Sequence, residues 1–543
     1  MPSVSKAAAV AAAVAASAVD ARTIFPKPTY QVTSPTNVTY PINTVDFAFS
    51  VASGSPTSDL LDNAFHRYYA IALGQSGAAA AFESTNWDYN NTTPIVGLEV
   101  TLESDDTSLT LETNVSYTLT VEAPTIKISA PNVYGAMNGL ESFSQLVEPD
   151  GTIVHTTVND NPRYQFRAVM IDTSRHYYPV DVILQHIDAM SYAKFNVLHW
   201  HIVDSVSFPY ESAEFPEMAQ QGAYSPSHTY TRDAIKTVIE YAANRGIRVI
   251  PEFDTPGHVQ QGYAALDPPV LTDCYTDGKP DGTTGPLNPT INATYDFLTK
   301  FYQEVKDLFP DQFVHVGGDE VSFDCWQSNP GIEKFMKDHP EIKDYSGLEQ
   351  YYELNLLEIL KAQNTSYICW QEIFDNGIDI LPDTVVDVWK GGTWQDEMAA
   401  VAKAGYHSVL SAPFYLNYIS YGEDWPNYYS VEPSNFTGGA EADAKGLIGG
   451  LEVCMWSEFV DATNFISRIW PRAAAVAERA WSAKDVTDVD DARERLHEFR
   501  CKLLNRGIGA EPITSGGSPT QLNGHNFCAQ EWNPRYSPPW STR

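Results

Sequence analysis

The chain of 543 residues carries 69 acidic and 34 basic residues, so its formal net charge is −35 and its pI is near 4.6. Such a surface repels the phosphates of nucleic acids, which argues strongly against a nucleic-acid-binding protein. The length exceeds that of one small domain and predicts two folded units around a large core.

Residues 1–21 predict a secretory signal peptide. Lys6 precedes a weakly apolar, alanine-rich run at 7–18, and small residues surround the expected cleavage site between Ala18 and Ala21. A disordered low-complexity tail is the alternative interpretation of these residues. The run is too short to span a membrane, and no other stretch approaches the necessary length, so we expect a protein without a membrane anchor.

Seven Asn-x-Ser/Thr sequons support this interpretation, because they lie on polar stretches as in a secreted, extracellular glycoprotein. They are at Asn37, Asn90, Asn91, Asn114, Asn292, Asn364 and Asn435.

Residues 22–160 predict a small N-terminal α+β domain. Strand-like segments lie at 45–51, 116–123 and 125–130, and helical patterns lie at 59–73 and 133–147.

Residues 161–510 repeat a different pattern, in which a short apolar strand is followed by a loop and a helical stretch. The eight expected strands lie at 166–172, 195–202, 247–253, 312–318, 366–372, 384–390, 407–412 and 450–456. Helical stretches lie at 231–245, 296–308 and 347–362, whereas the connection after 372 is short and irregular. Eight such repeats are typical of an α/β protein with a (β/α)8 TIM barrel. We expect residues 511–543 to form a C-terminal tail packed on the barrel.

The six cysteines include no C-x-x-C spacing, so the sequence does not favour a zinc site. A bridge between Cys274 and Cys325 would pin two loops beside an acidic motif, and a bridge between Cys501 and Cys528 would attach the tail to the last helix. Cys369 and Cys454 lie inside strand-like runs and are expected as buried thiols. Sequence alone does not prove these pairings.

The acidic motif is "HVGGDE" at 315–320, directly after an apolar strand. In a regular strand, Asp319 and Glu320 would point to opposite faces. The glycine pair at 317 and 318 can loosen that alternation at the end of the strand. The two carboxyls can then serve one site.

Active sites of TIM barrels form where the strands end and the following loops begin. Unusual polar and aromatic residues gather at these points: Asp172, Arg175, His201, Asp204, Asp254, His258, Asp319, Glu320, Trp370, Trp389, Tyr415, Trp456 and Glu458. Adjacent acids with several tryptophans indicate a sugar substrate, because aromatic faces stack on pyranose rings while carboxylates and arginine bind hydroxyls.

Other chemistries fit less well. There is no G-x-S-x-G motif for a serine nucleophile and no P-loop for phosphate transfer. His201, Asp204, Asp254 and His258 are residue types that bind metals, but no H-E-x-x-H pattern accompanies them, and hydrogen bonding behind the site is the favoured interpretation. We therefore expect neither a metal nor a cofactor.

Six motifs, in order from about residue 45 to the C-terminus, together resemble glycoside hydrolase family 20, the β-N-acetylhexosaminidases. They are "IDTSRHYYP", "LHWHIVDSVSFPYES", "PEFDTPGH", "HVGGDEV", "VWK" and "MWSEFVDATN". The resemblance implies an N-terminal α+β domain before the barrel.

The resemblance also implies roles for the acidic pair. Glu320 would act first as general acid and then as base at the glycosidic oxygen. Asp319 would orient the 2-acetamido group of the substrate and stabilise positive charge on it, while the acetamido oxygen attacks the sugar. This substrate-assisted route differs from the usual two-carboxylate scheme. Tyr415 would hydrogen-bond the acetamido oxygen.

Further residues are assigned in the same way. The substrate-binding set consists of Trp370, Trp389 and Trp456 around the acetamido methyl, and Arg175 and Glu458 on the sugar hydroxyls. Asp204 and His258 would form a polar relay behind Glu320. Structural roles are expected for Asp254 and Glu372, and His199 and His201 are expected as packed core histidines. Asn417 stands where some members of the family carry an acid that contacts the outer hydroxyls, so the resemblance implies no single preference among GlcNAc, GalNAc and 6-modified sugars.

The sequence thus predicts a secreted, retaining exo-β-N-acetylhexosaminidase that acts on β-linked GlcNAc or GalNAc in chitooligosaccharides and glycans. Homodimers are common in the resembling family. One alternative is a retaining glycosidase with two conventional carboxylates, which must stand on opposite sides of the sugar about 5 Å apart. Another is a carbohydrate-binding protein with an inactive barrel.

Overall fold

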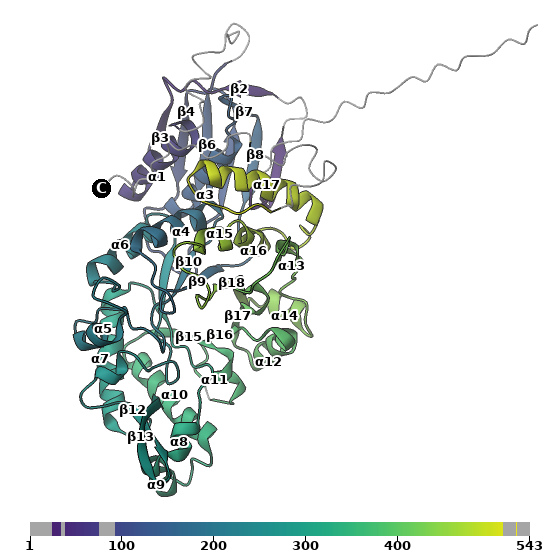
Figure 1. Cartoon of the computed structure of the whole chain (residues 1–543). Coiled ribbons are helices and arrows are strands. Elements are labelled where there is room, and N and C mark those ends of the chain that lie inside the picture. The colour runs from purple at the N-terminus through teal and green to yellow at the C-terminus, as the bar shows by residue number, and fades with distance from the viewer. Residues whose placement is uncertain (1–23, 34–37, 75–92, 379, 514–527, 529–543) are drawn as a thin grey trace, which may run out of the picture.

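The computed structural model describes residues 24–33, 38–74, 93–378, 380–513 and 528, which form an N-terminal sheet domain and a barrel (Figure 1). The signal-peptide prediction, the sequons at Asn37, Asn90 and Asn91, and most of the predicted tail lie outside these residues. Within the described ranges, every helix is too short or too polar to cross a lipid bilayer.

The N-terminal domain is built on a six-stranded sheet in the order β1-β8-β5-β6-β4-β3. Its strands are β1 (Tyr30–Thr33), β3 (Ala48–Val51), β4 (Gly97–Leu102), β5 (Tyr117–Val121), β6 (Thr125–Ala130) and β8 (Thr156–Asp160). The helices α1 (Asp59–Tyr69) and α3 (Val133–Leu146) pack together, and α3 contacts strands β4, β5 and β6. The short strands β2 (Thr39–Pro41) and β7 (Thr152–Val154) form a separate pair, and the π-helical turn η1 (Ala70–Gly74) extends α1.

The second unit is a closed barrel of eight parallel strands, so the predicted TIM barrel is confirmed. Its strands are β9 (Phe166–Asp172), β10 (Val197–His201), β11 (Arg248–Glu252), β14 (Phe313–His315), β15 (Ser366–Trp370), β16 (Val385–Val388), β17 (His407–Leu410) and β18 (Ile448–Met455). A layer of apolar side chains, including Phe166, Val197 and Ile250, fills one level of the barrel. The strands β9, β10 and β11 are buried along their whole length, as expected for a parallel sheet covered on both faces.

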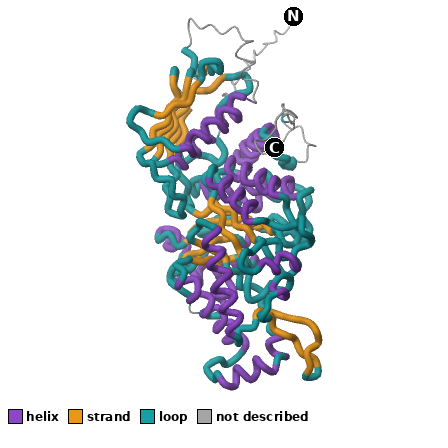
Figure 2. Tube along the Cα trace, turned by 90° about the vertical axis from the view of Figure 1, so that its left-hand side faces the viewer, coloured by secondary structure: helices purple, strands orange, loops and turns teal. Residues whose placement is uncertain are grey.

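Helices surround the barrel and complete the (β/α)8 pattern (Figure 2). The longer ones are α4 (Val180–Tyr192), α6 (Arg232–Ala243), α7 (Asn292–Leu308), α10 (Tyr345–Ala362), α12 (Trp394–Ala404), α16 (Arg472–Trp481) and α17 (Val489–Asn505). The short elements are α5 (Pro216–Gly222), α8 (Asp324–Ser328), α9 (Pro330–Asp338), α11 (Gln371–Asp375), α13 (Trp425–Tyr429), α14 (Gly439–Ala444), α15 (Phe465–Ile469), η2 (Tyr263–Ala265), η3 (Gly391–Thr393) and η4 (Ala412–Phe414). The five-residue α11 is the irregular connection that the sequence predicts after residue 372.

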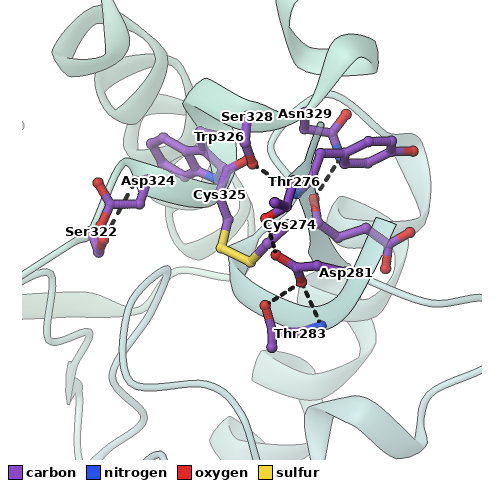
Figure 3. Close-up of a disulfide and its surroundings, with 12 residues drawn as sticks. Cys274, Thr276, Asp281, Thr283, Ser322, Asp324, Cys325, Trp326, Ser328 and Asn329 are labelled. Atoms are coloured by element: carbon purple, nitrogen blue, oxygen red, sulfur yellow. Dashed lines mark hydrogen bonds between the residues drawn. A yellow bond between two sulfur atoms is a disulfide. The ribbon is translucent and has the colours of Figure 1, made fainter. Parts of the chain in front are cut away.

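A hairpin of β12 (Leu271–Thr276) and β13 (Lys279–Leu287) projects from the barrel beside α8 and α9. The disulfide Cys274–Cys325 joins this hairpin to α8 (Figure 3). The Trp326 indole N–H adds a hydrogen bond to the Leu287 carbonyl at 3.1 Å. The predicted Cys501–Cys528 bridge is also present, and Cys369 and Cys454 are buried free thiols as expected.

A buried ion pair connects the sheet domain to the barrel. Lys194, just after α4, donates hydrogen bonds to Asp160 of β8 at 3.1 Å and to Tyr117 of β5 at 3.0 Å. The Lys194 and Asp160 side chains are both fully buried, and Trp481 of α16 donates its indole N–H to the same aspartate. The two units therefore share polar interactions that neither could satisfy alone.

Candidate active site

The glycine pair of the acidic motif forms a turn directly after β14. Gly317 and Gly318 have φ angles of +73° and +91°, where other residues are strained. A Cβ on Gly317 would lie 1.8 Å from Oδ1 of Asp254, so no larger residue fits there. The turn buries Asp319, which is 7% exposed, while the Glu320 side chain is 62% exposed at the rim. The two carboxyls thus leave one turn in different environments.

Asp254, which follows β11, lies against Asp319. Its Oδ1 accepts the backbone N–H of Gly318 at 2.8 Å. Burial and the nearby charge of Asp319 raise the pKa of Asp254 well above its usual range. A protonated Asp254 can donate a hydrogen bond to Asp319, whose Oδ1 has no partner among the described residues. The aspartate that sequence analysis treats as structural therefore holds the acidic pair in place.

His258 lies between Glu320 and a buried carboxylate. Its Nε2 is 3.7 Å from Oε2 of Glu320, and its Nδ1 is 3.2 Å from Oδ1 of Asp204. Burial lowers the pKa of His258, but the hydrogen bond to Asp204 and the charge of Asp319 outweigh this effect and raise it. A protonated His258 places positive charge behind Glu320.

Arg175 occupies the other side of Asp204. Its guanidinium lies 3.0 Å from Asp172 and 2.9 Å from Asp204, and it stacks over the Trp456 ring with its Cζ 5.0 Å from the ring centroid. These contacts fix the guanidinium plane while 17% of the side chain stays exposed. Glu458, two residues after Trp456, is exposed at the same strand end.

The three tryptophans and Tyr415 come from the ends of neighbouring strands. Trp370 ends β15, Trp389 follows β16, and Trp456 follows β18. The Trp370 and Trp456 ring centroids are 6.0 Å apart, and Trp389 stacks on Tyr415 at 6.3 Å. Tyr415 forms a β-bridge with Cys454 of β18, which sets the phenol beside these rings. The structure thus gathers four aromatic residues at one end of the barrel.

Two glutamates fix the indole rings. Trp370 donates its N–H to Oε1 of Glu252, and Trp389 donates its N–H to Oε2 of Glu372, each at 2.8 Å. Glu372 also pairs with Lys390 at 3.1 Å. The position of Glu372 at a strand end is the only sequence signal for this role. No sequence signal marks Glu252, which lies between a proline and a phenylalanine in "PEF".

His199 and His201 are buried, as expected, but they form ion pairs in the barrel core. Glu252 lies 3.0 Å from His199 and 2.6 Å from His201. His201 also contacts Asp204 at 2.9 Å, and His199 contacts Glu452 at 3.0 Å. Burial alone would lower the pKa of each histidine, but the carboxylates raise it to about 10. Both therefore carry charge in the core.

Asn417 follows Tyr415 on the loop after β17. It is half-buried, and its side-chain Oδ1 has no hydrogen-bond partner in the described part of the chain. A buried amide oxygen without a partner needs an explanation, such as an unseen water or ligand group.

A depression of about 410 Å³ has Glu320 and Trp389 among its lining residues. Its other lining residues are Val321, Phe323, Ser346, Glu349, Glu372, Asn376 and Lys390. A sugar chain attached to a ring near Trp389 would have space there.

Ligand-type atoms of Asp254, His258 and Asp319 lie within 4.8 Å of one another, as in a metal site. Within this set, His258 also contacts Asp204, and Asp254 accepts the Gly318 N–H.

Comparison with known proteins identifies this architecture. The model of the glycosyl hydrolase family 20 catalytic domain matches residues 164–484, and a model described as beta-acetyl hexosaminidase like matches residues 24–146. The chain belongs to glycosyl hydrolase family 20. It is a glycoside hydrolase of the β-N-acetylhexosaminidase type.

Relatives of this family 20 chain match it over most of its length. Beta-hexosaminidase subunit beta of Homo sapiens is 46% identical over 471 residues, covering 86% of this chain and 84% of the relative. Beta-hexosaminidase subunit alpha of Rattus norvegicus is 43% identical over 522 residues, covering 94% and 96%. The solved Flavobacterium johnsoniae chitobiase superposes with a TM-score of 0.77 at 31% identity, covering 89% of this chain and 73% of that one.

Proposed function

We propose that this enzyme is a retaining exo-β-N-acetylhexosaminidase that releases terminal non-reducing GlcNAc, and also GalNAc, from chitooligosaccharides and glycans by substrate-assisted catalysis. One observation carries the proposal. Asp319 and Glu320 leave a single turn, the first buried and the second exposed. A scheme with two conventional carboxylates needs the second carboxyl on the opposite face of the sugar.

In the proposed reaction, Glu320 protonates the glycosidic oxygen while the acetamido oxygen attacks C1 from the opposite face. The glycosidic bond breaks, the leaving alcohol departs, and a cyclic oxazolinium forms. Asp319 stabilises its positive charge, and Tyr415 hydrogen-bonds the acetamido oxygen. A water molecule then attacks C1, gives its proton to Glu320 and reopens the ring, so the product keeps the β configuration.

The binding residues are proposed from the same arrangement. Trp370, Trp389 and Trp456 would enclose the acetamido methyl, since their rings converge at one strand end. Arg175 would bind sugar hydroxyls with the exposed part of its guanidinium, assisted by Glu458 and Asn417. His258 and Asp204 would set the charge behind Glu320.

Secretion is proposed from the N-terminal run and from the sequons. The described sequon asparagines Asn114, Asn292, Asn364 and Asn435 are all exposed, as a glycan attachment site requires. Mass spectrometry of the protein secreted from a eukaryotic host would reveal glycans at these positions and an N-terminus near Ala21; a chain that keeps residues 1–21 would contradict the signal peptide.

A homodimer is also proposed. Tyr418, Ile419 and Tyr421 on the loop after β17 are 65%, 77% and 105% exposed, and Phe459 after β18 is 77% exposed. Exposed apolar side chains gathered on neighbouring loops are typical of a protein interface. Analytical ultracentrifugation should give twice the chain mass; a single-chain mass at micromolar concentration would contradict the dimer.

Hydrolysis of chitotetraose, followed by proton NMR, tests the reaction. We expect release of single GlcNAc residues from the non-reducing end, with the β-anomer appearing first. Initial release of the α-anomer, internal cleavage, or a stable glycosyl ester on Asp319 or Glu320 would contradict the proposal.

A further inference from the structure

One buried carboxylate connects the two halves of the site. Glu252 ends β11, and its side chain is fully buried. Its Oε1 accepts the Trp370 indole N–H at 2.8 Å, and its Oε2 lies 2.6 Å from Nδ1 of His201 and 3.0 Å from Nε2 of His199. Two N–H donors, on Trp370 and His201, and the close ring nitrogen of His199 thus surround a carboxylate that no solvent reaches.

The neighbouring groups favour the ionised form of Glu252. Burial raises the pKa of a carboxyl, but the charge of His201 and the close contacts with both histidines lower the pKa of Glu252 well below its usual range. His315 is also close, with its Nδ1 3.4 Å from Oε1, but this nitrogen accepts the Gly317 N–H at 3.1 Å. The charge on Glu252 is therefore held by the donors on β10 and β15.

The two oxygens of Glu252 face different parts of the site. Through Oε1 it contacts Trp370 in the aromatic cluster. Through Oε2 it contacts His201, which in turn contacts Asp204 at 2.9 Å, and Asp204 contacts both His258 and Arg175. A movement of this carboxylate would therefore displace Trp370 on one side and the His201–Asp204 pair on the other.

We propose that Glu252 is a positioning residue that orients both Trp370 and the His201–Asp204 pair. It would thereby hold the aromatic residues of the site at a fixed position relative to Asp204 and His258. This inference rests on the proposed function, in which Trp370 holds the acetamido group and Asp204 supports Glu320 through His258. A glutamate suits the position because a carboxylate accepts several hydrogen bonds at once.

Glu252→Gln tests the proposal, because an amide has one acceptor oxygen and would direct an N–H₂ group at N–H donors. The inhibition constant of N-acetylglucosamine should rise about 10- to 100-fold, since a hydrogen bond to a charged group is lost. In addition, kcat/KM should fall more for chitobiose, which has a poor leaving group, than for 4-nitrophenyl β-N-acetylglucosaminide.

Glu452→Gln is the matched control. Glu452 is similarly buried and contacts His199 at 3.0 Å through the other ring nitrogen, and no hydrogen bond joins it to Trp370 or His201 in the described structure. This variant should keep both the inhibition constant and the ratio between the two substrates. The proposal is overturned if Glu452→Gln reproduces both losses, or if Glu252→Gln lowers only the melting temperature.

Should Glu252→Gln fail to fold, Trp370→Phe tests the coupling from the other end by removing one donor to Glu252. The proposal expects a changed chitobiose-to-aryl ratio, and an unchanged ratio contradicts it. Inactivity of the wild-type enzyme on both substrates would instead contradict the proposed function, so the two failures are distinguishable.

Discussion

Asp319 and Glu320 are adjacent in the chain, yet their environments suit different tasks. Asp319 is enclosed beside Asp254 and is only 7% exposed. Glu320 is exposed beside His258, as the proposed proton exchange with a leaving group requires. The positive φ of both glycines and of Glu320, at +50°, produces this division. The backbone turn therefore accounts for the different roles that we propose for the two carboxyls.

We predict that substitution of each carboxyl causes a different loss of activity. Asp319→Asn should lower kcat for all N-acetylglucosaminides by about 100- to 1,000-fold, because an amide cannot stabilise the oxazolinium charge. Glu320→Gln should chiefly slow substrates with poor leaving groups, which need a proton to depart. Steady-state kinetics on a series of aryl glycosides would measure both. Equal sensitivity of the two variants to the leaving group would contradict these roles.

The sequence could place the strand-end residues, because barrel topology brings such ends together. It could not predict the role of Glu252, since a carboxylate inside an apolar run carries no signal of the side chains that contact it. Nor could the sequence predict the charge on His199 and His201, because Glu452 and Glu252, which contact them, come from other strands.

The main element beyond the barrel is the β12–β13 hairpin, which the disulfide Cys274–Cys325 ties to α8 (Figure 3). Cys325 lies on the segment that continues from Glu320. The Ser328 hydroxyl accepts the Tyr275 N–H at 3.0 Å and adds a second link to the hairpin. The bridge thus limits the movement of the chain that follows the turn at residues 317–320.

We predict that the double variant Cys274→Ser with Cys325→Ser loses activity before the barrel unfolds. Its kcat/KM should fall, and its free energy of unfolding should fall by about 2–4 kcal/mol. Kinetics and thermal circular dichroism would measure both. Cys501→Ser with Cys528→Ser is the control, because that bridge attaches Cys528 to helix α17 and not to the segment after Glu320. Normal kcat/KM in the first variant would show that the bridge does not support the site.

Element boundaries were predicted less well than element order. The expected strand at 312–318 is only Phe313–His315, because the backbone turns at Gly317 to bring Asp319 inward. Likewise, the expected strand at 366–372 ends at Trp370, and α11 starts at Gln371. Apolar patterns locate strands, but functional turns at their ends shorten them.

Across the whole molecule, the buried charges set a pH range for stability. The pKa values of His199 and His201 are about 10 in the folded protein, against 6.5 for an exposed histidine. The protonated histidines therefore stabilise the fold fully below about pH 6.5, and this stabilisation is lost as the pH rises toward 10. Burial raises the pKa of Asp254, Asp387 and Glu353, which also favours the folded state at low pH. Glu252 has the opposite effect, because its pKa is lowered in the folded state. The ionised Glu252 stabilises the fold above about pH 4.5, and this stabilisation is lost as the pH falls further.

We therefore predict that the melting temperature is highest between about pH 4.5 and 6.5 and falls steadily toward pH 10. Differential scanning calorimetry across this range would measure it. In Glu452→Gln the alkaline decrease should be smaller, because the variant removes a charge that raises the pKa of His199. A melting temperature that rises from pH 5 to pH 9 would contradict the charge assignment.

The most direct test of the central claim compares kcat/KM for 4-nitrophenyl β-N-acetylglucosaminide and 4-nitrophenyl β-glucoside. If the acetamido oxygen is the nucleophile, the glucoside lacks the attacking group. Its cleavage should be slower by several orders of magnitude, because oriented intramolecular attack contributes about 7–11 kcal/mol. Cleavage of both glycosides at similar rates would show that a protein carboxylate attacks the sugar, and would contradict substrate-assisted catalysis.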